Sequence, residues 1–144
     1  MRIPAFLSRL ARDCDGNAVV EFAIAGPIFI GMVIGVFQAG VQVQNYNALR
    51  SVASDVNRYV VVEYQKGNQL TPDQIEVRAA GVAMGAPYLL NSVRFDPTVT
   101  QPTSRVTGAK EFTLRLDYDL PNWLQILNVS DGKMTYSQAI FVPA

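Results

Sequence analysis

The chain has 144 residues, twelve basic and twelve acidic side chains, no histidine and a single cysteine, Cys14. This length accommodates one compact domain and a membrane segment. A net charge of zero without a basic stripe argues against nucleic-acid binding. Without imidazole, and with one thiol near the N-terminus, the sequence excludes most metal sites, nucleophilic triads and redox centres. We therefore expect a protein that is not an enzyme and that holds no metal or cofactor.

The first sixteen residues carry three arginines, Arg2, Arg9 and Arg12, and no long apolar run. By the positive-inside rule such a segment stays in the cytoplasm and directs the rest of the chain across the membrane. A secretory signal peptide fits poorly, because the small residues of Ala23-Ile24-Ala25 stand near the start of the apolar run and not after it. We expect the apolar run to remain as an anchor.

Residues 22–41 form this run, in which Gln38 is the only strongly polar side chain. Twenty helical residues span about 30 Å, the thickness of the hydrocarbon layer. Pro27 removes one backbone hydrogen bond and is expected to bend or loosen the helix. Gly31, Gly35 and Ala39 recur every four residues, a spacing that lets two helices approach closely. Glycine is also common in membrane helices without such a role, so both interpretations stay open.

Glu21 lies at the entrance of the apolar run, five residues after Gly16. A carboxylate in hydrocarbon costs at least a few kcal/mol and normally has a partner or a function. The alternative is a passive residue at the membrane interface that is solvated by lipid headgroups.

The segment Gly16-Asn17-Ala18-Val19-Val20-Glu21-Phe22 resembles the start of a prepilin. More narrowly it is similar to the TadE-like family, the small pseudopilins or minor pilins of the tight-adherence (Flp-type) pilus. The resemblance is specific over residues 9–41. It implies that a prepilin peptidase cleaves after Gly16, so that Asn17 becomes the first residue and Glu21 the fifth. It further implies that Glu21, next to Phe22, pairs with the new amine of a neighbouring subunit during assembly, in a low dielectric where ion pairs are strong.

The resemblance also implies partners and a location. The partners would be the prepilin peptidase, other pilin and pseudopilin subunits, and the inner-membrane assembly platform. The protein would cross the inner membrane once with a periplasmic head. Removing sixteen of the 144 residues leaves 128, which is long for a major Flp-type pilin and short for the larger members with an extra globular domain. A minor subunit is predicted; which one, and whether it enters the fibre, stays open. The alternative is an uncleaved, membrane-anchored periplasmic binding or interaction module.

The helix is expected to continue beyond the membrane, from about residue 18 to about residue 64, on the order of 70 Å. Polar side chains occupy one face, and Lys66-Gly67-Asn68 supplies the stop signals. The other face is an apolar stripe at i, i+3, i+4 and i+7 spacing that needs a surface to cover: Leu49, Val52, Ala53, Val56, Tyr59 and Val60.

A second helix is predicted to begin at Thr71-Pro72-Asp73, where a hydroxyl cap precedes a proline and an acidic residue. It should run to about Met84 and end at Gly85. Beyond Asn91 the apolar period changes to two, which predicts strands around residues 93–99, 111–120 and 134–142. Short connections favour an antiparallel sheet whose apolar face receives both helices.

The predicted fold class is therefore α+β and pilin-like, with a leader at 1–16, a transmembrane half-helix at 17–41 and an extracytoplasmic head at 42–144. Two features of the head leave alternatives. Residues 121–129 are too apolar for a free loop, so they form either a short helix over the sheet edge or an exposed contact patch. Glu111, Asp117 and Asp119 share one strand face with Arg115, and we interpret this face as solvated and not as a carboxylate pair for catalysis.

Overall fold

A computed structural model of the chain describes residues 15–120 and 132–144, with side chains described from Ala18 onward. The described elements are two helices and three strands: α2 (Asp15–Gln65), α3 (Pro72–Met84), β1 (Phe95–Thr100), β2 (Ala109–Asp119) and β3 (Lys133–Pro143). The chain divides into two compact units, residues 1–37 and 38–144. Residues 1–14 of the predicted leader and the apolar segment 121–129 lie outside the described residues.

The first unit contains the N-terminal part of α2. The helix is continuous through Pro27. Its apolar side chains face outward; Phe22, for example, is 77 % exposed. By length and composition α2 is able to cross a membrane, with a mean hydropathy of 2.2 in its most apolar window. The expected long apolar N-terminal helix is confirmed among the described residues.

The second unit contains the rest of α2, which ends where the sequence predicts. Gly67 has a φ of 86°, a conformation that glycine adopts without steric cost. Its N–H donates to the carbonyl of Tyr64, and the N–H of Asn68 donates to the carbonyl of Glu63. This is the Schellman arrangement, in which a left-handed glycine satisfies carbonyls at the end of a helix.

The second helix, α3, begins and ends at the predicted residues. The N–H of Gln74 donates to the hydroxyl oxygen of Thr71, while the side chain of Gln74 accepts a hydrogen bond from the N–H of Thr71. This capping box satisfies two backbone donors at once. One face of α3 packs into the core through Ile75, Ala79 and Ala83.

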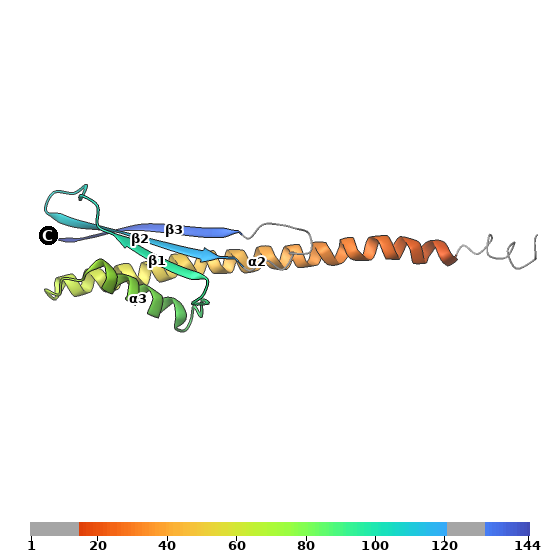
Figure 1. Cartoon of the computed structure of the whole chain (residues 1–144), viewed down its shortest axis with the longest axis horizontal. Helices are drawn as coiled ribbons and strands as arrows, with labels where there is room; N and C mark the ends of the chain where they lie inside the picture. Colours follow the sequence, from red (N-terminus) through yellow and green to blue (C-terminus); the bar gives the residue numbers. More distant parts are fainter. Residues whose placement is uncertain (1–14, 121–131) are drawn as a thin grey trace, which may run out of the picture. The chain divides into compact units, whose positions relative to one another are not determined.

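The three strands form an antiparallel sheet in the order β1-β2-β3. In the register, Phe95 lies opposite Tyr118 and Phe112 lies opposite Ile140. Figure 1 shows the strands on one side of the second unit, with α3 and the adjacent part of α2 on the other. Helix α3 also covers the outer edge of β1, because Glu76 accepts a hydrogen bond of 2.6 Å from the N–H of Val99.

One hydrophobic core joins the helices to the sheet, which confirms the predicted α+β fold. The stripe of α2 contributes Leu49, Val52, Ala53, Val56 and Val60, all fully buried. Tyr59 is half-buried and packs against the same cluster. From the sheet, the core takes the apolar face of β2 and its neighbours on β1 and β3: Phe95, Val99, Phe112, Leu114, Leu116, Tyr118, Ile140 and Val142. Full burial of one such aliphatic side chain stabilises the fold by about 1.5–3 kcal/mol.

Two expectations for the sheet are wrong. Val93 does not join the first strand and is 90 % exposed, because the side chain of Asn91 accepts from the N–H of Val93 and holds a turn before β1. The charged face of β2 is not fully solvated either. Glu111 and Asp117 are only 3 % and 6 % exposed, since basic and hydroxyl side chains cover them.

Candidate functional site

The predicted processing and assembly residues lie in the first two turns of α2. The helix begins at Asp15, so the backbone of Gly16 and of Asn17 is already helical. Glu21 and Phe22 follow on the next turn, and both are exposed. The structure therefore places the four residues on one continuous helix at the start of the apolar segment. Their roles in cleavage and assembly stay predictions.

The small-residue stripe lies farther along the same helix. A Cβ atom added at Gly31 or at Gly35 would meet no atom within 4 Å apart from its sequence neighbours and the local helix backbone. Ala39 is exposed. The stripe is thus sterically open within the described chain, which is the condition for close approach of a second helix. Its role in helix packing stays a prediction.

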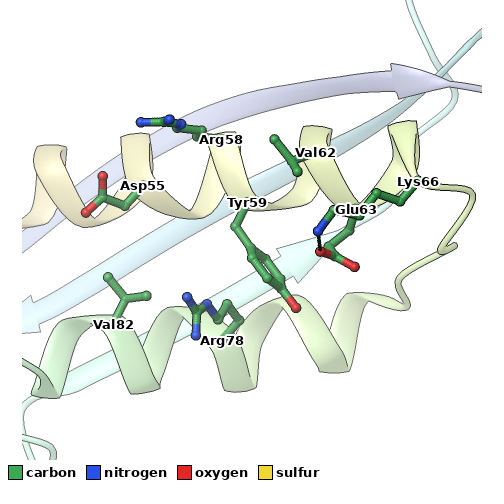
Figure 2. Close-up of a pocket in the computed structure, with 8 residues that line it drawn as sticks. All are labelled: Asp55, Arg58, Tyr59, Val62, Glu63, Lys66, Arg78 and Val82. Carbon is green, nitrogen blue, oxygen red and sulfur yellow. Dashed lines mark hydrogen bonds and ion pairs between the residues drawn. The ribbon is translucent and has the colours of Figure 1, made fainter.

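A groove in the second unit was not predicted from the sequence. It is an open depression of about 480 Å³ between α2 and α3. Figure 2 shows Tyr59 between the two helices beside Arg78, with Arg58 on the other margin of α2. Its walls are mixed, with five charged side chains, one tyrosine and two valines: Asp55, Arg58, Tyr59, Val62, Glu63, Lys66, Arg78 and Val82.

The groove's acidic side chains already have partners. The hydroxyl of Tyr88 donates to Asp55 at 2.8 Å. Glu63 accepts from Lys66 at 2.8 Å and from Asn68 at 2.7 Å. The hydrogen bond from Lys66, followed by that from Asn68, lowers the pKa of the Glu63 carboxyl, so this group is ionised at neutral pH. The hydroxyl of Tyr88 is a neutral donor and adds no positive charge beside Asp55; no ion pair joins either carboxylate to Arg58 or Arg78 among the described residues.

The two arginines of the groove have no carboxylate partner among the residues that the structure describes. The guanidinium of Arg78 lies over the ring of Tyr59, 4.5 Å from its centroid, a cation–π contact that orients the group without neutralising it. Arg58 is exposed on the margin of α2 that lies away from α3 in Figure 2. Chemically, the groove is able to bind anionic groups between two apolar contacts, Val62 and Val82.

The outer face of the sheet carries two ion-pair networks. In the first, Glu111 holds the loop that precedes β2. The guanidinium of Arg105 donates to it at 2.6 Å and 2.9 Å, and the backbone N–H of the same arginine donates at 3.0 Å. These hydrogen bonds, the side-chain ones first, lower the pKa of Glu111. The pair secures the loop to the strand.

The second network centres on Asp117. Burial alone would raise the pKa of Asp117, but hydrogen bonds from Thr135, Arg115 and Lys133 together outweigh it and lower the pKa. Arg115 and Lys133 approach the carboxylate at 3.2 Å and 3.3 Å. In both networks the acid is engaged by basic partners. Among the described residues no group of three or more potential metal ligands occurs.

The groove and the proximity of Asp96 to Asp117 were not predicted, because each brings together residues that lie far apart in the sequence. Arg58 and Arg78 lie on different helices, and no spacing rule relates them. Asp96 of β1 lies opposite Asp117 of β2, a proximity that only the strand register reveals.

Comparison with known proteins agrees with the N-terminal part of this description. The family model for TadE-like protein matches residues 16–58, which confirms the resemblance inferred from the motif around Gly16 and Glu21. The match covers the apolar helix and the first part of the amphipathic stripe. No curated protein and no solved structure matches the chain.

Proposed function

We propose that this chain, TadE-like over residues 16–58, is a minor pilin or pseudopilin that takes part in assembling a tight-adherence pilus. The family match indicates a pilus-related subunit in general. One observation carries the finer proposal: a glycine, a glutamate five residues later and an adjacent aromatic coincide with the start of a helix able to span a membrane. In this proposal a prepilin peptidase removes residues 1–16, and the remaining chain acts without enzymatic activity.

Glu21 is the assembly determinant in this proposal. Cleavage after Gly16 creates a positive amine on Asn17, four residues before the carboxylate. In a low dielectric an ion pair between the amine of one subunit and the carboxylate of the next is strong, and an unpaired charge is costly. Correct axial register between subunits is then favoured over mismatched register. The open stripe of Gly31, Gly35 and Ala39 lets neighbouring helices approach closely.

The proposed partners follow from this role. They are the prepilin peptidase, other pilin and pseudopilin subunits, and the inner-membrane assembly platform. The chain would cross the inner membrane once, with its N-terminus in the cytoplasm and the α+β head in the periplasm, as the three arginines of the leader favour. An uncleaved membrane-anchored binding module shares this topology but assigns no role to Gly16 or Glu21.

The Glu21→Gln variant tests the proposed function. It keeps the shape of the side chain and removes its charge, so membrane insertion should be retained or slightly improved. Piliation and surface adherence, measured by electron microscopy and an adherence assay, should fall about tenfold or more because the intersubunit ion pair is lost. Cleavage after Gly16 should persist, so the variant chain should still begin at Asn17.

The matched control is Asp73→Asn, which removes one exposed carboxylate from the head. It should leave piliation unchanged. Normal piliation in the Glu21→Gln strain would remove the assembly role of Glu21 and favour the interaction-module alternative.

A further inference from the structure

Two large apolar side chains are exposed on the connection between α3 and β1, residues 85–94. Leu89 is 73 % exposed and Val93 is 90 % exposed. We infer that this connection contacts the surface of the membrane that α2 is able to cross, with Leu89 and Val93 at the boundary between lipid headgroups and acyl chains. The contact rests on α2 as the membrane anchor of the proposed function, and not on cleavage after Gly16 or on assembly.

The connection lies at the end of the second unit where α2 enters it. Helix α3 returns along α2, because Arg78 lies over the ring of Tyr59 and the hydroxyl of Tyr88 then reaches Asp55. Successive contacts along the chain thus move back toward the apolar part of α2. Figure 1 shows the end of α3 and the start of β1 at this same end of the second unit.

The sheet is oriented in the same way. On β2, Phe112 contacts Tyr64 near the C-terminal end of α2, with 6.0 Å between the ring centroids. On β3, Tyr136 contacts Tyr46, much earlier on α2, with 6.1 Å between the ring centroids. Tyr136 lies opposite Leu116 of β2. Strand β2 therefore runs toward the apolar part of α2, and its last residues lie closest to it.

The connection ends close to the level at which the apolar run of α2 ends. Asp119 follows the partner of Tyr136 on β2 by three residues, about 10 Å along the strand. Its N–H donates to the carbonyl of Arg94 at 2.9 Å, and Val93 is the next residue back. Tyr46 lies five residues beyond the apolar run, about 8 Å along the helix. These two lengths are similar, so Val93 lies near the headgroup layer, which extends about 5–8 Å beyond the hydrocarbon.

The backbone of the connection holds Leu89 outward. Leu89 has a φ of 50°, a left-handed conformation that is unfavourable for a residue with a side chain. Its N–H donates to the carbonyl of Gly85 at 3.0 Å, and the N–H of Leu90 donates to the carbonyl of Ala83 at 2.9 Å. Leu90 is buried in the core, whereas Leu89 is exposed. Core packing explains Leu90, and a contact with lipid explains a leucine that is held away from the core.

The charges at this end of the sheet have both signs and do not select an anionic lipid. Lys133 lies opposite Asp119 in the strand register and pairs with Asp117. Arg94 and Asp96 flank the start of β1. The described residues here therefore lack the excess of cations that attracts anionic lipid. The contact is apolar in character, so a zwitterionic lipid such as phosphatidylcholine should be sufficient.

Fluorescence quenching of the full-length chain in phosphatidylcholine vesicles tests the contact. All chains carry Cys14→Ser, which removes the only natural thiol, and one introduced cysteine carries a fluorophore. Ser92→Cys places the fluorophore on the connection, and Thr103→Cys places it at the opposite end of the strands as a control; both positions are exposed. Lipid with a spin label on its headgroup should quench Ser92→Cys at least about threefold more than Thr103→Cys. Added phosphatidylglycerol should not increase the quenching.

Substitution of the two apolar side chains identifies what holds the contact. Leu89→Asn with Val93→Ser should reduce the quenching of the fluorophore at Ser92→Cys about threefold, because the apolar area removed from water is lost. Asparagine tolerates the left-handed conformation at position 89, so the fold should be retained, as circular dichroism checks. The matched control is Val77→Ser, which replaces a valine of α3 that is 73 % exposed, and it should leave the quenching unchanged.

A fluorophore at Val33→Cys, within the apolar part of α2, reports insertion through a spin label deep in the acyl chains. Quenching at Val33→Cys without headgroup quenching at Ser92→Cys would overturn the contact and leave the anchor in place. No quenching at either position would reject the anchor and the contact together. Quenching at Ser92→Cys that persists in the double variant, or that requires phosphatidylglycerol, would also overturn the contact. The N-terminus of the native chain tests processing after Gly16 separately.

Discussion

At the scale of single residues, the polar face of β2 is the clearest departure from expectation. Alternation of apolar and polar side chains correctly identifies which residues face the core, because the period of a strand is two. It does not reveal that Arg105, six residues before Glu111, covers that carboxylate. Nor does it reveal Thr135 and Lys133, which reach Asp117 from the next strand. Long-range pairing decides whether a carboxylate is solvated.

The Asp117 network predicts an acid-dependent loss of stability. The folded pKa of Asp117 is below the unfolded value of about 3.9, and Glu111 is likewise below about 4.3. At pH values between the folded and the unfolded pKa, the unfolded chain therefore binds more protons than the folded one. The free energy of unfolding has its full value above this pH range and falls as the pH decreases through it. Urea unfolding of a 42–144 fragment between pH 7 and pH 3 should show this decline.

Asp117→Asn should flatten that pH dependence and lower stability at pH 7, because an amide neutralises neither Arg115 nor Lys133. Asp119→Asn, on the same strand face but without an ion pair among the described residues, is the matched control and should keep the wild-type slope. If the free energy of unfolding changes equally with pH in the wild type and in Asp117→Asn, the Asp117 network does not contribute to the pH dependence of stability.

The buried stripe of α2 gives a second prediction for a single residue. Val56 is fully buried among helix and sheet side chains, so Val56→Asp places an unpaired charge in the core. The free energy of unfolding of the 42–144 fragment should fall by about 3 kcal/mol or more. Ser54→Asp, on the exposed face of the same helix, should change it by less than about 0.5 kcal/mol. Similar effects of the two variants would contradict the observed packing.

At the scale of elements, the helix and strand boundaries were largely predictable because local chemistry sets them. Gly67 ends α2, Thr71 caps α3, and strict alternation marks β2. The first strand begins at Phe95, later than the alternation predicts, since the turn held by Asn91 competes with strand formation at Val93. The side chain of Gln74 accepts from the N–H of Thr71 and completes a capping box around the predicted hydroxyl cap.

We predict that the sheet is stable only when the second half of α2 covers its apolar face. The α2 stripe supplies five fully buried residues to the core: Leu49, Val52, Ala53, Val56 and Val60. A fragment of residues 42–144 should be soluble and unfold cooperatively without metal, nucleotide or reducing agent. A fragment of residues 67–144 should aggregate, because an exposed apolar patch of several hundred Å² is rarely tolerated. Size-exclusion chromatography and denaturant unfolding distinguish them; equal solubility and stability would exclude α2 from the core.

At the scale of the whole molecule, sequence reasoning succeeded best for the N-terminal segment. The motif from Gly16 to Phe22 is short and specific, and the family match at residues 16–58 confirms the resemblance. The head is different, because its groove and its ion-pair networks arise from residues on separate helices and strands. No local sequence pattern encodes these contacts.

If the chain is a processed subunit, its native N-terminus is Asn17 and not Met1. Intact-mass measurement of the protein from piliated cells should show a chain that begins at Asn17 and has lost sixteen of its 144 residues. Gly16→Val should block this loss, because a β-branched side chain crowds a protease cleft at the membrane surface. A full-length chain of 144 residues in cells with active pili would contradict the account.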